Sequence, residues 1–143
     1  MWWDHTTLKL QLVENGRVIF QIPLSPINRS SDKVHDLAAF EDNFAHYSKL
    51  FTALSNDTRL MMMKHLIEKK NRTINFTDFM RELNLNPKLV WEHTKKLREG
   101  GLVIKIGRGR YRCSQFGETS FLIMNLAFRK ILQTIEETNN LKR

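Results

Sequence analysis

The sequence predicts an α+β fold, mostly α, arranged as a winged helix-turn-helix with an added N-terminal β-hairpin and a long terminal helix for dimerisation. Three observations predict it. From Val34 onward, apolar residues recur at helical spacing. Two short helical patterns meet at the turn LNLNP, residues 83–87. The β-prone segment 102–116 is interrupted by Gly107-Arg108-Gly109, which indicates a hairpin directly after the second helix.

Length and composition indicate one globular domain without a membrane segment. A chain of 143 residues suits a single core, since domains commonly hold about 100 to 200 residues. No apolar run approaches the roughly 20 residues that span a bilayer, and the start MWWDHTTLKL lacks the pattern of a signal peptide. The single Cys113 cannot form an internal disulfide. We therefore expect a cytoplasmic protein.

Positive charge is concentrated in one short stretch. The net charge is +8, and residues 86–112 hold eight lysine or arginine residues against two glutamates. Such a local excess is what a polyanion partner requires, because neutralising phosphates releases counterions and supplies affinity. A solvated basic face that serves solubility is the alternative.

The chain is expected to divide into residues 1–31, a β-hairpin and linker, and residues 32–143, the winged domain with flanking dimerisation helices. Residues 7–24 alternate apolar and polar on both sides of Asn15-Gly16. A two-residue loop would place the two apolar sets on opposite faces, so we expect a three-residue loop that starts at Glu14 and pairs Leu12 with Val18. Gly16 would then be left-handed, in a bulge.

The helices of the winged domain follow from their start and stop signals. The stripe from Val34 breaks near Asp42-Asn43, and SNDT, residues 55–58, begins a helix that runs to about residue 69. Residues 71–76 form a short strand, and Thr77 caps the first helix of the helix-turn-helix. The second helix begins at Pro87 and ends at Gly100-Gly101.

The terminal helix is expected from about residue 118 to 138. Its first half includes FLIMNLAF, residues 121–128, which is apolar on nearly every side. A helix at a monomer surface would not tolerate this pattern. We therefore expect its own domain to cover one side and a partner to cover the other.

Several segments resemble the ArsR-type winged-helix transcriptional regulators over about residues 43–120. They are LFTALSNDTRLMMMKHL, TDFMRELNLNPKLVWEHTKKLREGGLV and SQFGE, of which LSNDTRL and KKLREGGLV are the closest. The resemblance implies a homodimer whose recognition helices enter successive major grooves of double-stranded DNA while the wings reach backbone or minor groove. The dimer would form through the C-terminal and N-terminal helices.

The local chemistry gives a set of candidate DNA contacts in the recognition helix 87–99 and the basic wing 104–112. Val90 and Leu97, together with Leu89 and His93, can face inward, while Thr94 departs from the apolar residue expected on that side. Asn86 can donate and accept against a base edge, and Lys88 or Lys95 can meet guanine or phosphate. The full set is Asn86, Lys88, Trp91, Glu92, Lys95, Arg108, Arg110 and Arg112.

Two of these candidates have open roles. Glu92 either accepts from cytosine or pairs with Lys88 or Lys96 on the helix surface. Trp91 stands where similar proteins usually carry a small or polar residue. It would contact a thymine methyl, lie along the DNA backbone, or pack against neighbouring protein.

No metal, cofactor or catalytic site is expected. Many relatives bind metals through a thiolate motif that would fall at NFTDF, residues 75–79, where this sequence has no cysteine. The terminal helix has no histidine, and the five histidines show no compact ligand spacing. Cys113 is either a redox switch or a small strand residue. No activated nucleophile, paired carboxylates or phosphate-binding motif points to an enzyme.

The leading interpretation is therefore a dimeric DNA-binding transcriptional regulator. The alternatives are a winged-helix adaptor for other proteins and a nucleoid-type protein that binds DNA without sequence preference. The charge excess on the recognition helix and wing favours nucleic acid over an adaptor.

Overall fold

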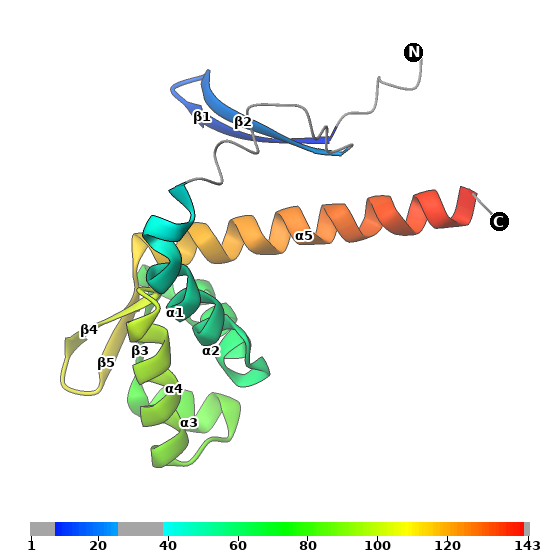
Figure 1. Cartoon of the computed structure of the whole chain (residues 1–143). Helices are drawn as coiled ribbons and strands as arrows, with labels where there is room; N and C mark the ends of the chain where they lie inside the picture. The colour runs from blue at the N-terminus through cyan, green and yellow to red at the C-terminus, as the bar shows by residue number, and fades with distance from the viewer. Residues whose placement is uncertain (1–7, 26–38, 142–143) are drawn as a thin grey trace. The chain divides into compact units, whose positions relative to one another are not determined.

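The computed structural model describes residues 8–25 and 39–141. Residues 39–124 form one compact unit, and the hairpin is grouped with the helix residues from Asn125 onward in another. The elements, whose helices and strands are labelled in Figure 1, are β1 (Leu8–Glu14), β2 (Arg17–Ser25), the 3-10 turn η3 (Glu41–Asn43), α1 (Phe44–Leu54), α2 (Asp57–Glu68), the 3-10 turn η4 (Lys70–Arg72), β3 (Thr73–Asn75), α3 (Phe76–Leu83), α4 (Pro87–Glu99), β4 (Val103–Gly107), β5 (Arg110–Cys113) and α5 (Gln115–Leu141).

The unit of residues 39–124 has the predicted winged helix-turn-helix architecture. Helices α3 and α4 form the helix-turn-helix, and β4 and β5 form the wing (Figure 1). The small strand β3 completes an antiparallel sheet of order β3-β5-β4, so β5 is its central strand. No helix within the described ranges is long and apolar enough to cross a membrane.

The core of this unit lies between the helices and the sheet. In α2 the methionine run is divided, because Met62 and Met63 are fully buried while Met61 is exposed. The buried apolar residues are Ala53, Met62, Met63, Leu66, Ile74, Phe79, Val90, Leu97, Leu102, Val103, Tyr111 and Cys113. These residues come from α1 through β5, so the helix-turn-helix and the wing share one core and hold a fixed geometry.

The start of α3 corrects one sequence expectation. Thr77 is not the cap, because the helix begins at Phe76, with Asn75 at the N-cap position and no side-chain hydrogen bond there. The backbone N–H of Phe76 instead donates to the Gly109 carbonyl at 2.7 Å. A contact with the wing thus satisfies one of the free N–H groups of the helix, which local sequence does not reveal.

The other helix boundaries agree more closely with those expected from the sequence. The expected break near Asp42-Asn43 is confirmed by η3, although the part of the stripe at Val34 lies outside the described residues. Helix α2 starts behind Asn56, whose side chain accepts from the Arg59 N–H at 3.1 Å. Helix α5 starts three residues earlier than expected, because Ser114 caps it by accepting from the backbone N–H of Gly117 at 2.8 Å.

The hairpin is confirmed, but its predicted loop is wrong. Glu14 pairs with Arg17 across a two-residue loop, in which Asn15 and Gly16 both have positive φ, 51° and 78°. These angles are typical of a type I′ turn. The register then shifts within β2, so Leu12 pairs with Phe20 rather than with Val18. The register shift that we expected from a three-residue loop is therefore produced by a bulge in β2.

Candidate nucleic-acid interface

The entrance to α4 is fixed by Asn86 and Pro87. The Asn86 side-chain oxygen accepts from the backbone N–H of Leu89 at 2.9 Å, and Pro87 occupies the first helical position. The oxygen of this candidate DNA contact is therefore committed to the cap, which leaves its amide nitrogen as the group for a base edge. Leu89 was expected on the inner face but is 37% exposed, which corrects that expectation.

The outer face of α4 carries charged side chains and one indole ring. Lys88, Trp91, Glu92 and Lys95 are all exposed, as the helical spacing predicts. The Lys95 ammonium lies 5.2 Å from the centroid of the Trp91 ring, within the range of a cation–π contact. Arg98 is also exposed and continues the same stripe, seven residues after Trp91. Sequence reasoning omitted it, although the spacing was visible.

Of the two roles left open for Glu92, a contact to cytosine and an ion pair on the helix surface, the ion pair is not found in the described residues 8–25 and 39–141. Lys96 lies 3.8 Å from Glu99, and among the described residues Glu92 makes no ion pair with Lys88 or Lys96. Glu92 lines a small hollow of about 250 Å³ beside the helix. Its carboxylate is thus available on the outer face.

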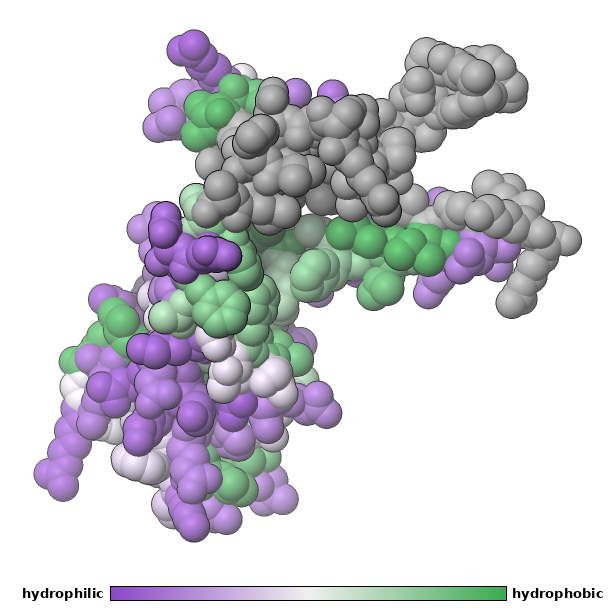
Figure 2. Space-filling view, in the orientation of Figure 1, coloured by the Kyte–Doolittle hydropathy of each residue, from purple (hydrophilic) through white to green (hydrophobic). Residues whose placement is uncertain are grey.

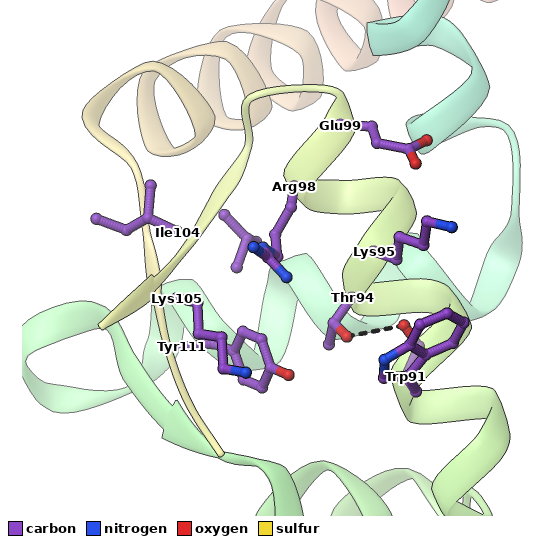
Figure 3. A pocket seen from close by; sticks show the side chains of 9 residues that line it. Trp91, Thr94, Lys95, Arg98, Glu99, Ile104, Lys105 and Tyr111 are labelled. Atoms are coloured by element: carbon purple, nitrogen blue, oxygen red, sulfur yellow. Dashed lines mark hydrogen bonds between the residues drawn. The ribbon is translucent and has the colours of Figure 1, made fainter. Parts of the chain in front are cut away.

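The inner face of α4 accommodates a polar residue in the core. Val90 and Leu97 are fully buried, and Thr94 is only 2% exposed. The Thr94 hydroxyl donates to the Val90 carbonyl at 2.8 Å. It also lies 3.1 Å from the Trp91 carbonyl (Figure 3). Because these backbone bonds satisfy the hydroxyl, threonine occupies the core position without leaving a polar group unpaired.

His93 connects α4 to the end of α1 through Arg59. The Arg59 guanidinium donates to the carbonyls of Ala53 at 2.7 Å and Thr52 at 2.9 Å, and its third contact is His93 Nδ1 at 3.1 Å. Burial lowers the pKa of His93, the Arg59 charge lowers it further, and Glu92 opposes both effects. The neutral ring can accept from Arg59, so the contact holds α4 against the end of α1.

The wing is a braced hairpin. In β5, Tyr111 and Cys113 are buried while Arg110 and Arg112 are exposed, so the two arginines share one face of the central strand. Arg108 is exposed at the turn, beside Gly109, whose φ of +66° suits glycine. Since β5 pairs on both sides, the charged strand is held by β3 as well as by β4.

An open groove separates α4 from the wing. It has a volume of about 610 Å³ and is lined by Trp91, Thr94, Lys95, Arg98, Glu99, Val103, Ile104, Lys105 and Tyr111. Figure 3 shows Arg98 on the helix side of this groove and Lys105 with Tyr111 on the strand side. Three cations and one carboxylate line it, so its charge is net positive.

The groove brings together only part of the predicted set. Trp91 and Lys95 line it, whereas Lys88, Glu92 and the three wing arginines lie outside its lining. Arg98 and Lys105 are the additions. Lys105 had no separate signal in the sequence, because only the pairing of β4 with β5 opposite Tyr111 places it beside the helix.

Cys113 has the properties of a packed strand residue. It is buried, and burial together with the Glu118 charge raises the pKa of its thiol to about 11. A thiol with such a pKa is protonated and weakly reactive near neutral pH. Within the part of the chain that the structure describes, no three histidine, cysteine or acidic side chains gather to hold a metal ion.

Residues 56–105 match the family model of the bacterial regulatory proteins of the arsR family. The chain carries an ArsR-family helix-turn-helix domain. No curated protein matches the chain. The matched segment begins at Asn56, the cap of α2, and ends at Lys105 within β4, so it contains the whole helix-turn-helix and the start of the wing's first strand.

The ArsR-family match supports a DNA-binding transcriptional regulator. It leaves β1, β2, α1, β5 and α5 outside the matched residues. The expected resemblance to ArsR-type regulators is thereby confirmed for residues 56–105, which contain α3 and α4.

Proposed function

We propose that the chain is a cytoplasmic homodimer that binds double-stranded DNA at specific sequences and regulates transcription. In this proposal α4 enters the major groove and the wing lies against the neighbouring backbone or minor groove. The observation that carries it is the cationic stripe of Lys88, Lys95 and Arg98 on the outer face of α4, beside a wing with exposed arginines. Figure 2 shows the surface over α3 and α4 as mainly hydrophilic.

The groove between α4 and the wing supports a specific path for the DNA backbone. When a helix occupies the major groove and a wing occupies the adjacent minor groove, one sugar-phosphate strand must pass between them. Lys95, Arg98 and Lys105 line the groove that this strand would follow. Lysine and arginine are the side chains that most often position a protein on phosphates, so these three would set the register of α4.

The wing arginines extend the same contact. Arg110 and Arg112 share one face of β5, and Arg108 projects from the turn. Arginine binds phosphate bidentately and also enters narrow minor grooves. The bond from the Phe76 N–H to the Gly109 carbonyl fixes the wing tip against α3, so these charges would be presented with little loss of conformational entropy.

Exposed apolar residues of α5 support the dimer. Leu122, Leu126, Phe128, Leu132 and Ile135 are exposed, and Phe128, Leu132 and Ile135 recur at spacings of four and three, the pattern of a helix that pairs with another. Phe128 is 59% exposed and Ile135 is 51% exposed. A second copy of α5 would cover this seam, and two recognition helices would then be presented together.

The N-terminal part of the described unit supplies a second apolar surface. Phe44 and Phe51 of α1 are exposed, and the rings of Phe40 and Tyr47 stack with centroids 5.3 Å apart. Exposed aromatic clusters of this kind are typical of protein interfaces. We assign α1 to the dimer interface together with α5.

Selection of bound duplexes from a random library by the full-length protein tests the proposal. We expect a palindromic motif, since a two-fold dimer reads two equivalent half-sites. If duplex binding falls steeply with salt while no sequence is enriched, the protein binds DNA without sequence preference and the regulator proposal is wrong. Absence of duplex binding would instead favour a protein adaptor.

A further inference from the structure

Trp91 is the one aromatic side chain on the outer face of α4. It is 57% exposed, in the second turn of the helix, where recognition helices present side chains to base edges. Its neighbours at three positions before and four positions after are Lys88 and Lys95, both exposed. An apolar ring therefore stands between two phosphate-binding charges and has no cover from the core of its own domain.

The ring is held in position rather than left free. The Lys95 ammonium lies over the ring, 5.2 Å from its centroid. The backbone carbonyl of Trp91 lies in the regular helix and accepts from the Thr94 hydroxyl. Trp91 lines both the groove toward the wing and the small hollow on the other side of α4. The indole is thus a ridge between two hollows, and Figure 3 shows it at the edge of the larger one.

We infer that Trp91 reads a thymine through its 5-methyl group. The inference rests on the proposed function, because it requires α4 to lie in the major groove. The floor of that groove presents hydrogen-bond donors and acceptors at every base pair, and the thymine methyl is its apolar group. The apolar face of the indole gains contact with the methyl group, whereas the same face against a guanine, adenine or cytosine edge would satisfy none of its polar groups.

The charges beside the ring supply affinity, and the ring itself supplies the selectivity. Lys88 and Lys95 bring α4 close to the backbone without distinguishing sequences, since phosphates are the same at every position. Trp91 then favours one base pair. Burying a methyl-sized apolar group changes affinity by about three- to five-fold, which is the discrimination we expect at this position.

The test replaces thymine with deoxyuridine, one position at a time, in the duplex selected from a random library. Uracil keeps every hydrogen-bonding group of thymine and lacks only the methyl. We expect one thymine in each half-site at which the replacement weakens binding by about three- to five-fold. Trp91→Gln should bind the thymine and uracil duplexes equally. Lys88→Gln, the matched control on the same face, should weaken both duplexes and keep their ratio.

The possible results separate the inference from the function beneath it. Failure to enrich any sequence overturns the proposed function and the Trp91 assignment together. An enriched duplex that is insensitive to uracil at every thymine overturns the Trp91 assignment alone. Retention of the thymine preference by Trp91→Gln does the same. Unfolding curves of both variants should match the wild type, because the two side chains are exposed.

Discussion

Gly117, in the first turn of α5, has no room for a side chain. A Cβ atom at this position would lie 2.1 Å from the carbonyl oxygen of Leu102, 2.8 Å from its carbonyl carbon and 2.9 Å from its Cα. All three atoms belong to the backbone, so a rotamer change cannot relieve the contact. The substitution Gly117→Ala therefore forces α5 away from the segment that leads into β4.

The magnitude follows from two opposing effects. In an exposed helix, alanine is more stable than glycine by about 1 kcal/mol, which favours the variant. Against this, overpacking a tight contact costs about 1 to 3 kcal/mol. The Leu102 carbonyl also accepts from the Ser114 N–H at 3.0 Å, and losing that bond adds about 1 kcal/mol. We expect a net destabilisation of about 1 to 3 kcal/mol.

Urea unfolding followed by circular dichroism measures this effect, with Gly107→Ala as the matched control. A Cβ at Gly107 would meet only the Arg110 side chain, at 4.0 Å, so the control should change the free energy of unfolding by less than about 0.5 kcal/mol. If Gly117→Ala is as stable as the wild type or more stable, helix propensity dominates and the close approach of α5 to Leu102 is wrong.

Three further predictions concern titration and DNA contacts. The pKa of His93 is lowered from its ordinary value of 6.5, so the unfolded chain binds the proton first as the pH falls. The free energy of unfolding should therefore decrease as the pH drops below about 6.5. Urea unfolding at pH 7.5 and pH 5 should show this decrease, and His93→Gln should make it smaller. The pKa of the Cys113 thiol is raised from 9.0 to about 11, so the free energy of unfolding should decrease as the pH rises from 9 to 11. An aromatic disulfide reagent at pH 8 should also label this thiol much more slowly in the native protein than in the unfolded chain. Arg98→Gln and Lys105→Gln should each weaken duplex binding at all sequences and lower the salt slope by about one, and an unchanged slope in titrations at several salt concentrations would remove that residue from the phosphate contact.

Local signals were sufficient to predict α4. Asn86, Pro87 and the pair Gly100-Gly101 are strong start and stop signals, and the outward stripe follows from a period of 3.6 residues. The wing is also readable locally, since the glycines at 107 and 109 interrupt two β-prone runs. For these elements the local preference and the tertiary fold agree, so the sequence alone was adequate.

Other features depend on contacts between distant residues. Arg59 and His93 are 34 positions apart, and nothing in either segment indicates that they meet. Lys105 joins the candidate interface only through the pairing of β4 with β5. The start of α3 at Phe76 depends on the Gly109 carbonyl of the wing, so the local cap at Thr77 was the wrong choice.

The prediction of the hairpin loop was wrong for a different reason. The requirement that apolar residues share a face was sound, but a bulge can satisfy it at several places along a strand. The structure keeps the two-residue turn that Asn15-Gly16 favours and shifts the register between Leu12 and Val13. Turn preference therefore prevailed at the loop, and the strand absorbed the mismatch.

The most direct test of the central claim is the ratio of affinities for the selected duplex and a scrambled duplex of equal length, measured with the full-length protein near 150 mM salt. We predict that the selected duplex binds at least about a thousand-fold more tightly, which is typical of specific DNA-binding proteins. Equal affinities for the two duplexes would contradict the assignment of α4 as a recognition helix.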